Sequence, residues 1–564
     1  MILRGVGRRY GLRGPWVLRG LDLELPARTL LRIEGANGVG KSTLLRLLAG
    51  VDAPTEGRLT DRPRTAYVPE RFPAALPFTA AGYLVHMGRV HGLPTAEAAV
   101  RAQEWLARFG AAGHARTPLA ELSKGTSQKV AVAQALLAEP DLLVLDEAWT
   151  GLDAAARGEL DRAVAERVAE GATVVFVDHD PRRLAGAAGL AYRLEGRTLT
   201  PAADSPGDTG PRVRIEATGR PSAALPPGLP GAPVVERDAG SPGAVRLTTT
   251  AAHSDTVLHA LLTARPAWHV TGLSQLPAPV PAPGPLATDG AAVDPMPRPA
   301  PGPGPAGTAA PVPERPGPAG TAAPVPETAS RPARAVRSPV GATTAVIRYQ
   351  AATLARSQRW LAPLLLYTAV LGIGVRAGQP LLDSLGYAAA ALLPAAAWFV
   401  RLCVTQEPLA ARTVTASAVG PSRAHLASLL TGLGCALALG AVGAGIVLLI
   451  SEPVSTDHTV AVPLLPAALA GLLAAWCSAL LGAAVGALCA RPVLHRHGWS
   501  LAATVSGALL ALVTDGSPAK AAVTGLVSGS LTGTVRVPLL PLAGAFAIAV
   551  AVAVPTSRIA ALRE

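Results

Sequence analysis

The chain has 564 residues, which at about 150 residues per domain suggests three or four units rather than one. Hydrophobic residues make up 50% and charged residues only 16%, whereas soluble domains carry about 25% charged residues, so the composition argues against a purely cytosolic enzyme. Four cysteines are too few for a scaffold held by disulfide bonds. The net charge of +12 fits binding to nucleic acid or to an anionic membrane surface.

The first part of the chain, residues 1–200, alternates short apolar β-type runs with helical stretches. Strands that alternate with helices favour a mostly parallel sheet covered by helices. The N-terminal residues lack the apolar segment of a signal peptide, so we expect this domain to be cytoplasmic. Strands are expected at residues 29–34, 65–68, 142–146 and 173–177.

A glycine-rich turn after the first of these strands carries the strongest chemical signal. Residues 35–43 read GANGVGKST and match the spacing GxxxxGK[ST]. The glycines let backbone N–H groups curl around phosphate oxygens, and the helix that follows adds a positive dipole. Lys41 can reach the β- and γ-phosphates of a nucleotide, and the Ser42 hydroxyl can hold magnesium. The residues expected to bind the nucleotide here are Gly35, Asn37, Gly38, Gly40, Lys41, Ser42 and Thr43.

Two carboxylates and a histidine follow buried strands further along the chain. The strand at 142–146 ends in Asp146, which we expect to reach the magnesium, and Glu147 comes next. Glu147 points elsewhere and can polarise the attacking water as a general base. His179 lies two residues after the strand at 173–177 and can hydrogen-bond the γ-phosphate and the attacking water. We therefore expect Glu147 and His179 to be catalytic.

These motifs together resemble the ATP-binding cassette (ABC) family over about residues 1–200. Residues 122–129 read LSKGTSQK and look like the family signature LSGGQ with its flank, while residues 149–153 look like the D-loop. The signature is degenerate, because Lys124 and Thr126 replace the usual Gly and Gln. The resemblance implies an α/β P-loop NTPase fold that hydrolyses ATP with magnesium as cofactor.

The resemblance also implies roles that the spacing alone does not. Ser123 and Gly125 would contact the γ-phosphate bound to another subunit, so the chain must dimerise, with its own copy or with a related half-transporter. Tyr10 resembles the aromatic residue that stacks on adenine, and Trp16 is the less well-spaced alternative. Glu70 replaces the glutamine of the Q-loop and would still bind magnesium. The expected metal ligands are then Ser42, Glu70 and Asp146.

Two segments with weaker sequence signals follow. Residues 201–277 predict a small β/α appendage, and residues 278–340 form a linker rich in Pro, Ala and Gly that contains the repeat PGPAGTAAPVPE twice. Such a composition cannot bury enough apolar surface to offset chain entropy, so we expect a disordered spacer, with a proline-rich docking ligand as the alternative. Within the appendage, strands are expected at 212–217, 244–249 and 268–273 and a helix at 256–262.

The remaining residues, 341–564, carry few charges and are expected to be embedded in the membrane. A helix at 345–359 has one apolar and one cationic face and is expected to lie in the headgroup plane. After it come six apolar stretches, each about long enough to cross a hydrocarbon core of about 30 Å. The stretch 515–536 could in addition re-enter the membrane. The spans are expected near 360–375, 384–403, 426–450, 461–489, 498–514 and 537–555.

Arginines gather in the loops that would face the cytoplasm, which is the positive-inside pattern of a multi-pass protein of the plasma membrane. We thus expect an all-α transmembrane domain of six helices, which resembles, more weakly, the permease half of type-2 ABC exporters. The loop at 406–423 looks like the segment on which the cassette of that family pushes. The abundance of Arg and Ala suggests a bacterial source.

The expected function is that of an ATP-driven half-transporter that exports a lipidic, amphiphilic or peptide-like cargo. Its expected partners are a second half-transporter, membrane lipid and a transported substrate of unknown identity. The alternative is a membrane-anchored ABC ATPase that senses or regulates and moves no solute. A soluble cassette acting on nucleic acid is excluded, because it would need paired cassettes in one chain and would leave the six spans unexplained.

Overall fold

The computed structural model divides the chain into two compact units. The first joins Met1–Ala203 to Val336–Glu564, and the second is Asp204–Ala335. Within the first unit we call strands β1 to β9 with helices α1 to α5 the N-terminal domain, and helices α7 to α15 the helical domain. The described residues are 1–11, 14–72, 75–180, 183–184, 187–202, 212–219, 225, 233–237, 243–264, 268–276, 339–494 and 497–563.

A six-stranded sheet organises the N-terminal domain. Its strand order is β5-β6-β7-β3-β8-β9, and all neighbours are parallel except β8 and β9. Strands β5, β6 and β7 are buried along their whole length, which suits apolar runs covered on both faces. The strands are β3 (Leu30–Glu34), β5 (Thr65–Val68), β6 (Leu142–Asp146), β7 (Thr173–Val177), β8 (Leu190–Glu195) and β9 (Thr198–Pro201).

Two hydrophobic cores lie on opposite faces of this sheet, because successive strand residues point to opposite sides. Val144 and Val175 pack with helix α1 on one face, whereas Leu143, Leu145 and Val174 pack with the other helices on the second face. The helices are α1 (Lys41–Leu48), α2 (Ala80–Val90), α3 (Thr95–Arg108), α4 (Lys124–Leu136) and α5 (Ala154–Ala169), with 3-10 turns at Ala112–His114 and Leu119–Glu121.

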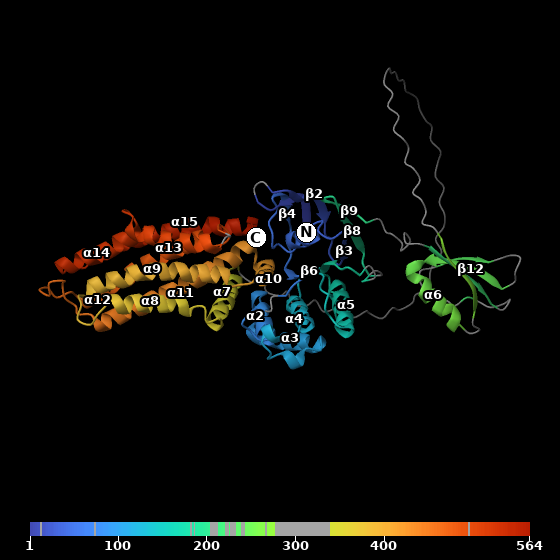
Figure 1. Ribbon diagram of the computed structural model, residues 1–564, viewed down its shortest axis with the longest axis horizontal. Helices are drawn as coiled ribbons and strands as arrows, with labels where there is room; N and C mark the ends of the chain where they lie inside the picture. The colour runs from blue at the N-terminus through green and yellow to red at the C-terminus, as the bar shows by residue number, and fades with distance from the viewer. Residues whose placement is uncertain are drawn as a thin grey trace, which may run out of the picture. The chain divides into compact units, whose positions relative to one another are not determined.

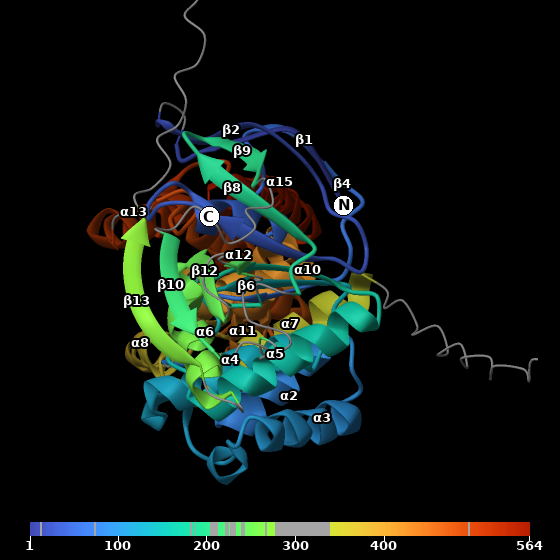
Figure 2. The same cartoon turned by 90° about the vertical axis from the view of Figure 1, so that its right-hand side faces the viewer.

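A separate antiparallel sheet, in the order β2-β1-β4, was not anticipated from the sequence. Register shifts interrupt the pairing of β1 with both neighbours, so its residues lack the regular alternation by which a half-buried strand is recognised. This sheet and helices α2 and α3 lie at opposite ends of the N-terminal domain (Figures 1 and 2). Its strands are β1 (Ile2–Arg9), β2 (Trp16–Glu24) and β4 (Glu56–Thr60).

The helical domain is a bundle whose central helix is α9, which contacts α8, α11, α12, α13 and α14 (Figure 1). Small residues allow close approach: a Cβ on Gly482 of α12 would lie 2.5 Å from the carbonyl oxygen of Leu393 in α9. The helices are α7 (Pro339–Arg356), α8 (Leu361–Gly374), α9 (Leu381–Thr405), α10 (Leu409–Val419), α11 (Pro421–Ile450), α12 (Leu464–Leu488), α13 (His497–Val513), α14 (Pro518–Thr532) and α15 (Leu539–Arg563).

Among the described residues, four helices are long and apolar enough to cross a membrane, namely α9, α11, α12 and α15. Helices α13 and α14 meet this criterion together as a pair bent by 46°, so the stretch after the predicted fifth span holds a second helical arm. The predicted first span corresponds to α8, which has 14 residues and is therefore only about 21 Å long. The structure thus supports four to five spans by length, where the sequence predicted six.

Helix α7 differs from the predicted interfacial helix in the face that it buries. Leu354 of the predicted apolar face is buried, but Ala351 of that face is exposed. The buried side instead includes Val346, Tyr349 and Gln350. Val346 and Tyr349 belong to the same hydrophobic core as α2 of the N-terminal domain, so protein rather than lipid covers this side of the helix.

The second unit contains a four-stranded antiparallel sheet in the order β11-β12-β10-β13 together with helix α6. Its core includes Ile215, Leu247, Val257, Leu261 and Trp268. Strand β11 was not anticipated from the sequence. The predicted spacer lies outside the described residues as far as residue 338. The elements are β10 (Arg212–Thr218), β11 (Val234–Arg237), β12 (Ala244–Thr250), α6 (Ala251–Thr263) and β13 (His269–Leu276).

Candidate nucleotide-binding site

A cavity of about 460 Å³ opens at the carboxyl ends of the parallel strands. It brings the predicted phosphate-binding turn together with Glu70, Glu147 and His179, which come from three separate loops. Sites at this edge are typical of open α/β sheets, because loops from neighbouring strands converge there. The lining residues are Val17, Asn37, Gly38, Gly40, Lys41, Ser42, Thr43, Glu70, Glu147 and His179.

The phosphate-binding turn connects β3 to α1 through left-handed backbone. Gly38 and Gly40 have φ values of 81° and 111°, which only glycine adopts readily. The Lys41 ammonium donates to the carbonyl oxygens of Gly35 and Ala36 at 2.7 and 3.0 Å. Lys41 therefore lies folded over its own turn, with its charge at the place where phosphate oxygens would be held by the surrounding N–H groups.

Asp146 ends strand β6 and is only 3% exposed. The Ser42 hydroxyl donates to its Oδ1 at 3.3 Å, and the Tyr67 hydroxyl donates to its Oδ2 at 3.1 Å. Burial raises the pKa of the Asp146 carboxyl to about 6, although these two hydrogen bonds act in the opposite direction. A buried carboxylate beside a hydroxyl is a hard oxygen donor set, so the residues present fit magnesium, whose charge would offset the cost of burying Asp146.

Glu147 and His179 lie within hydrogen-bonding distance, with 2.8 Å between Glu147 Oε1 and His179 Nε2. Glu147 has a positive φ of 52°, which is strained for a residue with a side chain. Its N–H donates to the carbonyl oxygen of Val177 at 3.1 Å, which fixes this backbone at the end of the neighbouring strand. Glu147 and His179 thus lie side by side at the cavity.

The signature segment lies outside this cavity, since neither Ser123 nor Gly125 is among its lining residues. Ser123 caps helix α4, with its hydroxyl accepting from the N–H of Thr126 at 3.1 Å. Gly125 lies against the D-loop, where a Cβ would come within 2.9 Å of the carbonyl oxygen of Gly151. The exposed amino end of α4 is thus available to a phosphate that this subunit does not itself hold.

Tyr10 is also absent from the residues that line the cavity, whereas Val17 is among them. The Tyr10 hydroxyl donates to Asp52 Oδ2 at 3.2 Å, and the guanidinium of Arg8 lies 4.8 Å from the centre of the Tyr10 ring. Trp16, the alternative, has the guanidinium groups of Arg9 and Arg19 at 4.9 and 5.2 Å from its ring centre. The assignment of the adenine-stacking residue therefore stays a prediction. Val17 lines the cavity but was not expected there from the sequence.

Tyr67 is the other residue that sequence reasoning missed. It lies in β5, and its hydroxyl meets Asp146 only because β5 pairs with β6 in parallel register. An aromatic residue within an apolar run is typical of a hydrophobic core, and the sequence does not show which strands are neighbours. Burial and the nearby Asp146 carboxylate raise the pKa of the Tyr67 phenol, so it remains a hydrogen-bond donor.

The N-terminal domain and the helical domain share one continuous hydrophobic core, which joins α2 and α4 to α7, α10 and α11. The ring of Phe78 stacks on that of Tyr349 in α7 with 5.6 Å between centroids, and the His86 ring lies 5.9 Å from the same tyrosine. Burial lowers the pKa of His86 to about 4, and the charges of Arg356 and Arg89 add to this effect. His86 is therefore a neutral packing residue at neutral pH.

Two further contacts connect the domains. Arg46 of α1 lines a groove together with residues of α10 that include Leu409 and Ala416. At the end of α15, the guanidinium of Arg8 donates to the carbonyl oxygen of Leu562 at 2.8 Å. Helix α7, the first helix of the helical domain, and helix α15, its last, therefore both contact the domain that carries the nucleotide site.

Comparison with known proteins adds an independent line of information. The family described as ABC transporter matches residues 18–150. A zinc import ATP-binding protein of Cereibacter sphaeroides is 40% identical over 169 residues, which cover 29% of this chain and 67% of that protein. A lipoprotein-releasing system ATP-binding protein of Nitratidesulfovibrio vulgaris is 34% identical over 217 residues, covering 35% of this chain and 93% of that protein.

A solved dimeric ATP-binding cassette, in a post-hydrolysis state with ADP and Pi, is 24% identical and covers 35% of this chain and 95% of its own, with a TM-score of 0.32.

Proposed function

We propose, because this chain belongs through its N-terminal domain to the ABC transporter family, that it is one half of an ATP-driven membrane transporter. The N-terminal domain is an ATPase cassette of this family. The observation that carries the proposal is the hydrophobic core shared by the cassette and helices α7, α10 and α11. A core continuous across two domains lets a movement of one displace the other, because packed interiors transmit strain.

For hydrolysis, the turn at residues 35–43 holds the phosphates and Lys41 neutralises their charge. Glu147 acts as the general base on the attacking water, and His179, 2.8 Å away, orients that water toward the γ-phosphate. Ser42 and Asp146 would hold magnesium, with Glu70 as a further oxygen ligand, and the metal would supply positive charge that offsets the charge of the phosphates.

The working unit that we propose contains two chains. The cavity of one subunit is open and lacks its own Ser123 and Gly125, so a second subunit would supply these residues to close over the γ-phosphate. Whether that subunit is an identical chain or a related half-transporter is left to experiment. Binding of two nucleotides would then favour the closed dimer, and hydrolysis would release it.

Helices α7 and α10 are the elements on which closure of the cassettes would act. Helix α10 lies between two candidate spans, α9 and α11, and contacts β5 and α2 of the cassette. Helix α7 precedes the first apolar helix and carries Tyr349 into the stack with Phe78. Movement of the cassette would thus reach the start of α8, the end of α9 and the start of α11.

Export is the direction that we propose, because no feature of the sequence suggests a partner that delivers substrate from outside. The cargo proposed is lipidic, amphiphilic or peptide-like, in keeping with apolar helices of low charge. The relatives named for import or for lipoprotein release match only the cassette, so they carry no argument about direction. From the arginine-rich loops we also propose that the cassette lies on the cytoplasmic side of a bacterial plasma membrane.

A second candidate function is a membrane-anchored ATPase that senses or regulates without moving a solute. It is favoured by the second unit, which has its own sheet and core and is inserted between the cassette and α7.

Reconstitution of the full chain in vesicles distinguishes the two functions. A fluorescent phospholipid, an amphiphilic dye and a labelled apolar peptide serve as probes, with Glu147→Gln as the inactive control. ATP-dependent movement of any probe in the wild type but not in the control supports a transporter. Turnover of ATP without movement of any of the three classes favours the regulator.

A further inference from the structure

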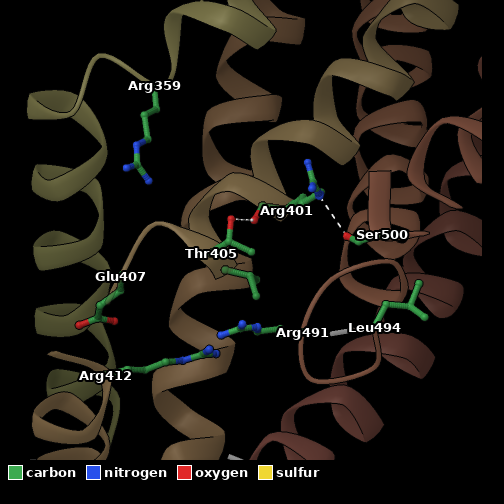
Figure 3. A pocket seen from close by; sticks show the side chains of 9 residues that line it. Arg359, Arg401, Thr405, Glu407, Arg412, Arg491, Leu494 and Ser500 are labelled. Atoms are coloured by element: carbon green, nitrogen blue, oxygen red, sulfur yellow. Dashed lines mark hydrogen bonds between the residues drawn. The ribbon is translucent and has the colours of Figure 1, made fainter. Parts of the chain in front are cut away.

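A second cavity, of about 290 Å³, lies within the helical domain and shares no lining residue with the nucleotide site (Figure 3). It is found where the ends of α9 and α12, the start of α13 and helix α10 meet. Its size is at the small end of the range for ligand sites, which run from about 300 to 1,000 Å³. The lining residues are Arg359, Arg401, Val404, Thr405, Glu407, Arg412, Arg491, Leu494 and Ser500.

Four of these residues are arginines, and they come from four different parts of the fold. Arg359 follows α7, Arg401 lies in α9, Arg412 in α10, and Arg491 follows α12. Figure 3 shows the side chains of Arg412 and Arg491 extending toward one another. Four like charges around one small cavity repel each other, and an anion bound among them would reduce this repulsion.

The single carboxylate in the lining, Glu407, interacts with Arg412 and with uncharged donors. Glu407 Oε2 accepts from the Gln350 amide of α7 at 2.7 Å, and Oε1 accepts from the Thr415 hydroxyl at 3.5 Å. Glu407 therefore ties α7 to α10. This one carboxylate can offset the charge of only one of the four guanidinium groups.

Arg401 shows that the cavity is a built site rather than a solvated cluster. Its side chain is buried, at 8% exposure, and its Nε donates to the Ser500 hydroxyl at 3.1 Å. Its Nη2 is also buried but has no hydrogen-bond partner among the described residues. A buried, charged donor without a partner is costly, and an acceptor inside the cavity would remove that cost.

We propose that this cavity binds an anionic phosphate group. Planar guanidinium groups suit the oxygens of phosphate, which they can engage through paired N–H donors. A phosphate monoester carries close to two negative charges at neutral pH, which suits four arginines better than a singly charged carboxylate. This proposal does not depend on the direction or the cargo of transport.

Two sources can supply such a group. The arginines lie at the ends of the spans that we expect to face the cytoplasm, where basic pockets between helices bind lipid headgroups. A soluble phosphate ester from the cytoplasm has the same chemistry. Because Arg412 belongs to α10, which contacts the cassette, occupancy would also alter the rate of ATP hydrolysis.

The test uses the full chain in nanodiscs of phosphatidylcholine with increasing phosphatidic acid, and in parallel glycerol 3-phosphate added to phosphatidylcholine nanodiscs. Thermal unfolding midpoint and ATP hydrolysis are the readouts. Arg401→Gln and Arg491→Gln are the site variants. Arg376→Gln, an exposed arginine that follows α8, is the matched control.

We expect phosphatidic acid to raise the unfolding midpoint of the wild type and of Arg376→Gln, with half-saturation shifted at least tenfold in both site variants. A response to phosphatidic acid alone identifies a lipid headgroup, and an equal response to glycerol 3-phosphate identifies a soluble ester. Because Arg491 is exposed, its variant keeps the test valid should Arg401→Gln fail to fold. Equal responses in Arg491→Gln and Arg376→Gln, or no response of the wild type to either probe, would overturn the proposal.

Discussion

Phe78 of the cassette stacks on Tyr349 of helix α7, with ring centroids 5.6 Å apart and planes inclined by 19°. Phe78 follows strand β5 by ten residues, and Tyr349 lies in the helix that leads into the apolar bundle. Both side chains are buried, and they belong to the core that the two domains share. It is therefore a direct mechanical contact between the nucleotide-binding domain and the membrane-facing helices.

The first prediction concerns this contact. Phe78→Leu and Tyr349→Leu should each lower the thermal unfolding midpoint, and the double variant should lose less than the sum, because the stack can be lost only once. The expected coupling is about 0.5–1.5 kcal/mol. Trp105→Leu is the control. Trp105 lies in α3 and stacks on Phe109, the residue that directly follows this helix, so its substitution should combine additively with Tyr349→Leu. Additive losses for Phe78 and Tyr349 would contradict the coupling.

The second prediction concerns the general base. Glu147→Gln should bind ATP and dimerise, while its hydrolysis rate should fall by about a hundredfold or more, as is typical when a general base is removed. Glu104→Gln changes an exposed carboxylate on α3 in the same way and should hydrolyse ATP at the normal rate. Phosphate release measures the hydrolysis rate, and sedimentation in the presence of ATP measures dimerisation. Near-normal turnover in Glu147→Gln would assign the base to another residue.

The third prediction concerns Glu70, which lines the nucleotide cavity in place of the family's glutamine. A carboxylate there adds negative charge beside a triphosphate, so magnesium is needed to offset it. Glu70→Gln should therefore shift the magnesium dependence of ATP hydrolysis to lower concentration. Glu24→Gln, an exposed change in β2, should leave the titration where it is. Superimposable magnesium titrations of wild type and Glu70→Gln would reject this role.

The fourth prediction concerns pH. The pKa of His86 falls from its ordinary value of 6.5 to about 4 because the ring is buried, with Arg356 and Arg89 close by. The unfolded chain therefore binds a proton between these pH values and the folded chain does not. The contribution of the buried, neutral His86 ring to folding stability is complete above pH 6.5 and decreases as the pH falls toward 4.

His86→Leu should therefore show a smaller drop in unfolding midpoint than the wild type between pH 7 and pH 5. His114→Gln, which alters an exposed histidine in a 3-10 turn, should keep the wild-type drop. Identical pH profiles for wild type and His86→Leu would show that another group controls this dependence.

The buried parallel strands of the cassette could be predicted to within a residue, as β5, β6 and β7 show, whereas the parallel strand β8, which is partly exposed, was not anticipated. Buried parallel strands are continuous apolar runs bounded by turns, so their ends are visible in the sequence. The same holds for the phosphate-binding turn, whose chemistry lies in consecutive residues. Strand β1 could not be predicted, because its pairing is irregular and its interior includes glycines.

Contacts between distant segments were the part of the site that the sequence could not supply. Tyr67 reaches Asp146 through the order of strands in the sheet, and Val17 reaches the cavity from the second sheet. The buried face of α7 was misjudged for a similar reason. Periodicity finds an apolar stripe, but it does not show that a protein domain, with Phe78 and His86, covers the neighbouring stripe.

The link between Arg8 and Leu562 has a consequence for how the protein is made. Arg8 is fully buried, yet the carbonyl oxygen that accepts from it belongs to a residue translated 554 positions later. During synthesis the cassette is therefore made before this acceptor, and Arg8 lacks the hydrogen bond until residue 562 has been added.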